Sequence, residues 1–339
     1  RALFRRMLRF FESFLDPVAP PGARAARFGG VAVPADPPPA TLSGAYWHYI
    51  RQAKAVFAGL FVMGAGVALL DATIPIFIGT VVSLLEAHAP GALFAEAWPT
   101  LAAMAAVILL GRPLAIGLQN LIVQQMVVPG FTSLVRWQAH RSVSRQGLNF
   151  FQEDFSGRIA NRVMQMGPAL RESIVSAVNA VWYILVYGSG AVLWLATADA
   201  RLAAPILVWF ALSAALLRFL VPRLRDRARR ASEARSALTG RIVDSYGNIQ
   251  TVKLFARADE EDAFVREGVE RLNRDFGQQT RLVTLNSVLL AGLNAALMVT
   301  MAALSLWLWS RGEIGAGTVA AALPMAWQIS NISGWVAFN

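Results

Sequence analysis

Six long apolar stretches, separated by arginine-rich segments, constrain this chain more than any other feature. Crossing the ~30 Å hydrocarbon core of a bilayer takes about 20 apolar residues in a helix. Of the 339 residues, 56% are hydrophobic and only 15% are charged, whereas soluble domains carry about 25% charged residues. The sequence therefore predicts an all-α membrane protein with six transmembrane helices, at about 55–85, 97–121, 174–197, 201–221, 283–310 and 316–339.

Lysine and arginine are distributed unequally between the segments that connect these stretches. Twenty-eight of the 31 lie before residue 55 or within 136–171 and 218–281, and only Arg201 and Arg311 lie in the connections on the other side. Because short cytoplasmic loops retain positive charge, we expect the N-terminus and both long segments in the cytoplasm. The net charge of +10 then fits a lipid bilayer as partner, and no aromatic platform for nucleic acid accompanies it.

The two long arginine-rich segments have the composition of helices rather than loops. Residues 136–151 and 223–240 contain few helix breakers and many good helix formers. Sixteen helical residues extend about 24 Å at 1.5 Å per residue. We therefore expect spans two to five to continue as two long cytoplasmic helical hairpins, each with a turn at its tip. The external connections at 198–200 and 311–315 are short.

The N-terminal region differs in composition from the rest. Residues 1–16 combine basic and apolar residues at helical spacing, which fits an amphipathic helix on an anionic leaflet, and a mobile basic tail fits equally well. Residues 17–40 are rich in Pro, Ala and Gly and are expected to be a linker. The transmembrane domain is expected at 41–339. No cysteine is present, and the three histidines lie too far apart in sequence to suggest a metal site.

The first cytoplasmic tip is expected within residues 150–163, which read FFQEDFSGRIANRV. The acids and the Ser-Gly pair within 153–157 interrupt one helix and suit the start of the next, where the helix dipole favours negative charge. Phe151, Phe155 and Ile159 repeat at intervals of four and predict an apolar stripe. A stripe so far from the membrane needs a partner to cover it.

The second tip is expected around residues 249–264. The run IQTVKLF at 249–255 is followed by four consecutive acids at 259–262, which are expected to open a short helix. Phe264 follows these acids and can face the same kind of partner as the first tip.

These motifs resemble those of the type IV ABC exporters, a family that includes bacterial lipid flippases and multidrug exporters. The runs at 150–163 and 249–264 are similar to the two coupling helices of that family, and GEIGAGT at 312–318 is similar to its turn before the last span. The resemblance covers about 41–339. It implies a dimer of six-helix units around an alternating cavity, with nucleotide-binding domains docked on the tips through Phe151, Asp154, Phe155, Gly157, Arg162, Phe255, Glu260 and Phe264.

The sequence departs from the family in lacking the motif that binds ATP. A Walker A loop needs G-x-x-x-x-G-K-[ST], and neither Lys54 nor Lys253 follows a glycine. We therefore expect no catalytic residue here, with ATP and Mg²⁺ bound to a nucleotide-binding domain that follows in the same polypeptide. The chain is interpreted as half of an exporter of the bacterial inner membrane, truncated before that domain and paired with a second half-transporter.

Polar residues inside the apolar stretches are candidates for function. Asp71 is either a cavity-facing carboxylate or a structural residue, paired with Arg112 or placed at a kink caused by Pro75. Arg112 either pairs with Asp71 or extends toward the interface. The remaining candidates for the substrate cavity lie in the last span: Trp327, Gln328 and Asn331.

Two other classes of function compete with the exporter hypothesis. A proton-coupled transporter with the same membrane fold and no ATPase domain would use Asp71 as its proton carrier. A membrane scaffold without transport activity would leave the polar residues spread through the spans unexplained. The residues do not identify a substrate. The net charge and one acidic residue within the spans are compatible with drugs, lipids, peptides and glycans alike.

Overall fold

The computed structural model describes Pro39 and residues 41–89, 91–153, 156–255 and 258–336. The predicted N-terminal helix, almost all of the predicted linker and two coupling candidates, Asp154 and Phe155, lie outside the described residues. The described part is almost entirely helical, without a β-strand. Its elements are α2 (Leu42–Gln52), α3 (Lys54–Ala87), α4 (Leu93–Ala106), η2 (Val107–Gly111), α5 (Arg112–Leu121), η3 (Ile122–Phe131), α6 (Thr132–Val143), α7 (Leu148–Glu153), α8 (Ser156–Ser176), η4 (Ala177–Trp182), α9 (Tyr183–Ala198), α10 (Ala200–Gly247), α11 (Ile249–Phe255), α12 (Ala258–Ser310) and α13 (Ala316–Val336).

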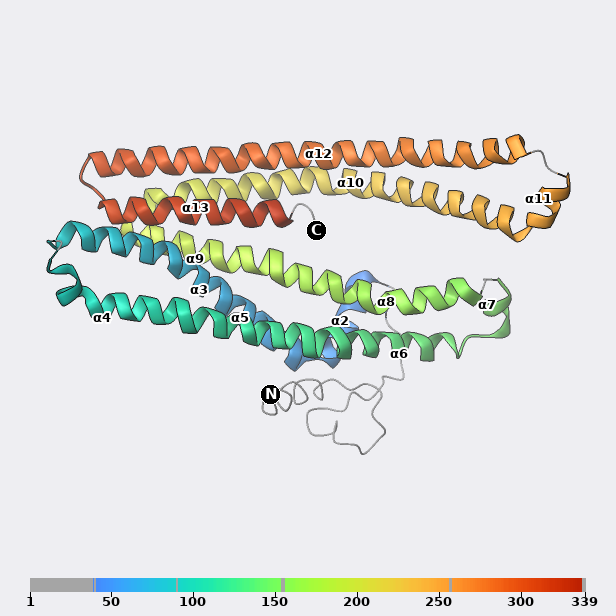
Figure 1. The fold of residues 1–339 in the computed structure, drawn as a ribbon, viewed down its shortest axis with the longest axis horizontal. Coiled ribbons are helices and arrows are strands. Elements are labelled where there is room, and N and C mark those ends of the chain that lie inside the picture. Colours follow the sequence, from blue (N-terminus) through green and yellow to red (C-terminus); the bar gives the residue numbers. More distant parts are fainter. Residues whose placement is uncertain (1–38, 40, 90, 154–155, 256–257, 337–339) are drawn as a thin grey trace, which may run out of the picture.

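Two long helical hairpins run side by side and carry their tips at the same end of the molecule (Figure 1). In one, α6 and α8 are joined through the short helix α7; in the other, α10 and α12 are joined through α11. We call the end with α7 and α11 the tip end, and the opposite end, with the short connections around Asp199 and Gly312, the loop end. The predicted hairpins are confirmed.

The tips differ in detail from the sequence prediction. Residues 136–151 do not form one helix, because α6 ends at Val143 and the turn at residues 144–147, which ends in a glycine, separates it from α7. The acids at 259–261 lie in the first turn of α12 and so open a helix of 53 residues rather than a short one. The short helix of this tip is α11, which precedes them.

Five continuous helical segments of the described chain are long and apolar enough to cross a membrane: Lys54–Ala87, Leu93–Val143, Ser156–Ala198, Ala200–Gly247 and Asp259–Ser310. They contain the first five predicted spans. The sixth predicted span corresponds to α13, a helix of 21 residues that is less apolar because it carries polar residues such as Gln328 and Asn331. α13 packs against α3, α9 and α12, and so lies within the helix bundle.

Three π-helical segments, η2, η3 and η4, interrupt the second and third long segments. Two of them accompany prolines: Pro113 follows η2 by two residues, and Pro129 lies inside η3. Proline cannot donate a backbone hydrogen bond, and a wider turn accommodates the missing bond without ending the helix. The residue after each π segment is also rotated about the helix axis relative to an uninterrupted α-helix.

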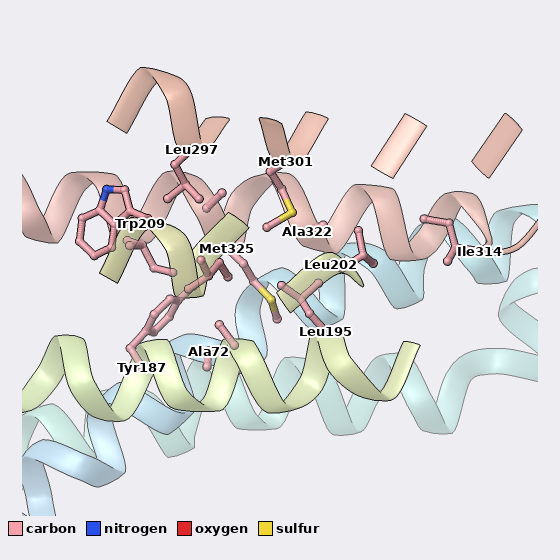
Figure 2. Close-up of a cluster of buried hydrophobic side chains, with 14 of the residues drawn as sticks. Ala72, Tyr187, Leu195, Leu202, Trp209, Leu297, Met301, Ile314, Ala322 and Met325 are labelled. Carbon is pink, nitrogen blue, oxygen red and sulfur yellow. The ribbon is translucent and has the colours of Figure 1, made fainter. Parts of the chain in front are cut away.

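Two buried clusters hold the bundle together. The larger one combines side chains of α3, α9, α10, α12 and α13, among them Tyr187, Leu202 and Met325 (Figure 2). The smaller one joins α2 and the first half of α3 to η3, α6, α8 and η4, with Phe57 and Phe131 in edge-to-face contact at 5.0 Å between ring centroids. The larger cluster ties the two hairpins to each other.

Close contact between α3 and α13 depends on two glycines. A Cβ atom added to Gly79 would lie 2.3 Å from the carbonyl oxygen of Gly317, and one added to Gly317 would lie 2.5 Å from the carbonyl oxygen of Gly79. Small residues allow membrane helices to approach backbone to backbone. This contact fixes α13 against α3 and therefore sets the rotation of the polar residues that α13 carries.

Candidate functional site

Asp71 lies in the middle of α3 and is almost completely buried, with 8% of its surface exposed. Both of its carboxylate oxygens accept a hydrogen bond. The Arg112 guanidinium donates through Nε to Oδ1 at 2.6 Å, and the Tyr183 hydroxyl donates to Oδ2 at 2.5 Å. Three helices, α3, α5 and α9, thus meet at one buried carboxylate.

The local structure of each helix directs these side chains toward one another. Pro75 has no N–H for the carbonyl of the residue four positions earlier, which is Asp71 itself. Arg112 follows directly after η2, and Tyr183 directly after η4. Because each π segment rotates the residues that follow it, the two donors converge on α3 at positions that an uninterrupted helical periodicity would not give.

The polar cluster extends beyond these three residues. The Gln328 side chain of α13 lies near the Tyr183 hydroxyl. The Tyr183 ring stacks on Tyr187 with 6.1 Å between centroids and 6° between planes. The Tyr187 hydroxyl is buried and has no hydrogen-bond partner within the described part of the chain. α13 therefore borders the cluster around the Asp71 carboxylate.

The structure shows the Asp71–Arg112 pair that the sequence suggested, and the cavity role of Asp71 stays a prediction. The other polar side chains of the spans also make contacts between helices: Gln119 donates to Asn179 at 3.3 Å, and Asn294 accepts from Trp209 at 2.9 Å. Bonds of this kind are typical of packed membrane helices.

The cavity candidates of α13 lie on a face distinct from its buried one. Met325 and Ile329 are fully buried, whereas Trp327 is 58% exposed and Asn331, four residues further, is exposed as well. Gln328 lies between the two faces and is half-buried. The structure thus leaves one aromatic and one amide side chain of the last helix open on the same face.

At the first tip, Phe151 is exposed in α7 and its ring meets that of Phe150 edge to face at 5.4 Å. Gly157 and Arg162 are exposed in α8. Ile159, predicted to continue the apolar stripe, is only 7% exposed. It is buried within this chain because α7 and α8 are separate helices, so the interval of four does not place Ile159 on the face of Phe151.

At the second tip, Phe255 ends α11 with 84% of its surface exposed, and Leu254 beside it is also exposed. Phe264 is 45% exposed, because the Arg241 guanidinium covers one face of its ring at 4.5 Å. Arg241 also donates to the Phe264 carbonyl at 2.6 Å and to Glu267 at 2.9 Å. The exposed apolar surface of this tip is therefore supplied mainly by α11.

Additional contacts fix the base of the second tip. The Ser245 hydroxyl of α10 donates to the Glu261 carboxylate in the first turn of α12. Glu260, one of the coupling candidates, lies exposed in that same turn. The bond between Ser245 and Glu261 thus joins α10 to α12, the helices that precede and follow α11.

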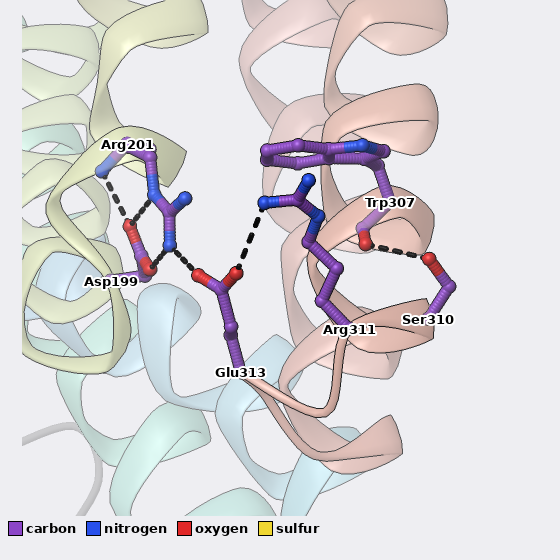
Figure 3. A network of polar contacts seen from close by, with 6 residues as sticks. All are labelled: Asp199, Arg201, Trp307, Ser310, Arg311 and Glu313. Carbon is purple, nitrogen blue, oxygen red and sulfur yellow. Dashed lines mark hydrogen bonds and ion pairs between the residues drawn. The ribbon is translucent and has the colours of Figure 1, made fainter.

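At the loop end, a second ion network joins the α9–α10 connection to the α12–α13 connection (Figure 3). Arg201 donates to Asp199 at 2.6 and 3.0 Å and forms an ion pair with Glu313. Arg311 lies 3.8 Å from Glu313 and 4.2 Å from the centroid of the Trp307 ring. The two arginines in the connections at this end are therefore matched by two carboxylates.

Sequence reasoning missed Tyr183, Arg241 and Ser245. A tyrosine in an apolar span has the same sequence pattern as a core aromatic residue, and Arg241 is one of the many arginines in its segment. Their roles depend on neighbours that are distant in sequence: Asp71 is 112 positions from Tyr183, and Glu267 is 26 positions from Arg241. Among the described residues, no group of three or more His, Cys, Asp or Glu side chains is arranged to hold a metal ion.

Comparison with known proteins gives two matches. The sequence model of the family described as the ABC transporter transmembrane region matches residues 57–332. A protein of Haemophilus influenzae, described as an uncharacterized ABC transporter ATP-binding protein, is 32% identical over 291 residues, which are 86% of this chain and 47% of that protein. The chain thus spans about half the length of the curated relative it matches.

Proposed function

The chain belongs to the family of ABC transporter transmembrane regions, and we propose that it is the membrane domain of an ATP-driven exporter that works by alternating access as a dimer. The observation that carries this proposal is the apolar surface of both tips, above all Phe255 with 84% exposure. Exposed aromatic residues on rigid helices that extend far from the apolar spans are typical of a surface that docks another domain.

The docking partner that we propose is a nucleotide-binding domain in the same polypeptide. Its support is that the matched relative is described as an ATP-binding protein and is about twice as long as the region that matches. ATP and Mg²⁺ would bind to that domain and not to this chain. Phe151, Gly157 and Arg162 would contact it from one tip, and Phe255, Glu260 and Phe264 from the other.

The orientation that we propose places the tip end in the cytoplasm of a bacterial cell and the chain in the inner membrane. The excess of lysine and arginine in the tip segments supports this orientation. The network at the loop end adds to the argument, because Arg201 and Arg311 lie beside the carboxylates of Asp199 and Glu313. The two positive charges on the external side are thereby balanced.

A second half-transporter completes the cavity in this proposal. Trp327 and Asn331 on the open face of α13 would line it, with Gln328 at its edge. Asp71 would influence the cavity from behind, through Tyr183 and Gln328, since it is itself buried. An aromatic ring next to an amide suits an amphipathic substrate.

The alternative of a proton-coupled transporter has less support. It needs Asp71 to accept and release a proton, but both oxygens of this carboxylate already accept hydrogen bonds from Arg112 and Tyr183. A proton on Asp71 would replace its ion pair with Arg112 and leave the guanidinium without its carboxylate partner, so a carrier would have to break and remake this pair in every cycle.

Substitution of Phe255 by alanine tests the proposal. In the full-length protein, Phe255→Ala should lower substrate-stimulated ATPase activity about tenfold, as expected when an aromatic anchor is removed from an interface. The matched control is Phe94→Ala, which removes another highly exposed ring, 73% exposed, from the loop-end part of α4 and should leave stimulation unchanged. Equal stimulation in both variants would show that α11 does not transmit the signal.

A further inference from the structure

Four arginines line one cavity between α10 and α12, on the tip side of the apolar spans. The cavity has a volume of about 710 Å³, and its arginines are Arg223, Arg227 and Arg230 of α10 and Arg281 of α12. One acid, Asp226, also lines it, so that the cavity carries three more positive than negative charges. This volume is within the range of sites that bind small molecules or headgroups, roughly 300–1,000 Å³.

Two of these arginines, Arg223 and Arg281, lie at the depth of a lipid headgroup, and Arg227 and Arg230 follow about one and two helical turns further out. Arg223 is two residues beyond the predicted end of span four, at residue 221, and Arg281 is two residues before the predicted start of span five, at residue 283. At 1.5 Å per residue in upright helices, Arg223 and Arg281 lie about 3 Å beyond the hydrocarbon core, and the backbones of Arg227 and Arg230 lie about 9 and 14 Å beyond it, so their long side chains must extend toward the membrane to reach a headgroup. The headgroup layer of a bilayer is roughly 5–8 Å thick on each side.

The cavity wall is apolar on the membrane side and charged on the other. Leu282 and Leu285 line the membrane side, and Arg223 bends toward the same side, with its guanidinium 3.6 Å from the centroid of the Phe219 ring. Arg227 donates to Gln278 of α12 and thereby bridges the two helices that line the cavity. An acyl chain and a phosphate group are the two parts of a ligand that such a wall matches.

The arginines have unused capacity to bind an anion. Within the described ranges, none of the four forms an ion pair with a carboxylate within 4.0 Å. By contrast Arg229, on the other side of α10, is paired with Glu233 at 2.9 Å. A guanidinium binds phosphate through two parallel hydrogen bonds, and several guanidinium groups around one cavity favour a group with more than one anionic oxygen.

We propose that this cavity binds the phosphate headgroup of an anionic phospholipid from the leaflet on the tip side of the membrane. Basic pockets between transmembrane helices at the cytoplasmic surface are suited to anionic headgroups. The bound lipid would join α10 to α12 where both helices leave the membrane, and would stiffen the base of the hairpin that carries α11. This inference rests on the proposed function only in one respect, which is that the leaflet on the tip side is the cytoplasmic one.

The test is a titration of the purified full-length protein with phosphatidylglycerol in neutral detergent, followed by native mass spectrometry. The variant Arg227→Gln/Arg230→Gln removes two cavity charges. Its dissociation constant should rise about 30-fold, or about fivefold for each arginine. The matched control is Arg225→Gln/Arg229→Gln, which removes the same charge from the same stretch of α10 but from residues that do not line the cavity; its dissociation constant should stay within about twofold.

Two further arms identify the source of the anion. Phosphatidylcholine should bind equally to the wild type and to both double variants. Inorganic phosphate in excess should not displace phosphatidylglycerol from the wild type. Displacement by phosphate would mean that the ligand of the cavity is a free anion rather than a lipid. Equal binding of phosphatidylglycerol to both double variants would overturn the site. Loss of the dimer in Arg227→Gln/Arg230→Gln alone would show that a second copy of the chain, rather than a lipid, fills the cavity.

ATPase activity separates a failure of this inference from a failure of the proposed function. The wild-type protein should hydrolyse ATP in phosphatidylcholine nanodiscs, where the cavity has no anionic lipid. Intact ATPase activity, with no difference in lipid binding between the two double variants, would refute only the lipid site. Absence of ATPase activity in every protein, with the difference in lipid binding preserved, would remove the exporter proposal and leave the site in place.

Discussion

Two ion networks of similar composition hold helices together in opposite surroundings. In the bundle, the carboxylate of Asp71, 8% exposed, accepts hydrogen bonds from Arg112 and Tyr183 and joins α3, α5 and α9. At the loop end, Arg201 lies between Asp199 and Glu313 and joins two connections at the surface (Figure 3). Both networks use arginine and carboxylate, so the difference between them comes from what surrounds them.

The comparison teaches that burial, more than bond number, decides how much a network matters. A buried carboxylate that loses its partner stays out of water and keeps the full cost of desolvation. An exposed pair that is broken is solvated at once, and salt screens it even when intact. The loop-end network has at least as many contacts as the buried one, yet its loss should cost much less.

Arg112→Ala should have the largest effect of the changes that test this comparison. The variant leaves the Asp71 carboxylate buried without its cation, and the free energy of unfolding should fall by about 3–5 kcal/mol. Thermal unfolding in detergent measures this loss. Asp71→Asn/Arg112→Gln serves as the control, since it removes both charges together and should destabilise less than Arg112→Ala alone. If the double variant is the less stable one, the pair is not governed by desolvation.

Tyr183→Phe should have an intermediate effect. It removes one hydrogen bond to Asp71 and the contact with Gln328 while it keeps the ring stacked on Tyr187. The expected loss is about 1–2 kcal/mol, above the average interhelical hydrogen bond in a bilayer and within the range for bonds to charged groups. The same unfolding measurement checks it. A loss as large as that of Arg112→Ala would mean that the hydroxyl, rather than the guanidinium, stabilises the carboxylate.

Arg201→Gln should destabilise the protein several-fold less than Arg112→Ala, although it removes contacts to two carboxylates at once. The side chains of Arg201 and Glu313 are 47% and 34% exposed, and ion pairs that solvent reaches contribute little. Raising the salt concentration should reduce the difference in free energy of unfolding between Arg201→Gln and the wild type. The corresponding difference between Arg112→Ala and the wild type should stay almost unchanged. Equal sensitivity to salt would contradict the contrast between the two sites.

The pH dependence of the loop-end network should be the smallest effect. The Arg201 guanidinium, together with the backbone N–H of Arg201, lowers the pKa of Asp199 below its ordinary value. A carboxylate with a lowered pKa in the folded state contributes stability above its unfolded pKa of about 3.9, and this contribution is lost as the pH falls through the lower folded value. Between pH 5 and 8 the difference in free energy of unfolding between the wild type and Arg201→Gln, measured by thermal unfolding, should therefore be constant. A difference that changes within that range would point to another titrating group.

The sequence predicted the fold in outline because its strongest signals are local. Apolar length marks the spans, and the lack of helix breakers between 223 and 240 predicted correctly that α10 continues far beyond the fourth span. The turn at 144–147 was missed, since no proline marks it and its only breaker is a single glycine, Gly147.

The candidate site was predictable only in part. Asp71 and Arg112 were recognised as exceptional, because a charge inside an apolar span is costly at any position. Whether they pair depends on the rotation of two helices, and the π segments before Arg112 and Tyr183 change that rotation. Hydrophobic periodicity cannot report a shift of this kind, and Tyr183 gave no signal at all.

The sequence by itself determined the class of the protein, the positions of its long apolar helices and the positions of its tips, since these depend on composition over tens of residues. Only the tertiary structure decided which polar groups meet: the Asp71 carboxylate with two donors, Arg241 on the Phe264 ring and four arginines around one cavity. The physical reason is that hydrogen bonds and ion pairs act over a few ångströms. The helices that bring these groups within reach are positioned by packing far from the groups themselves, as at Gly79 and Gly317.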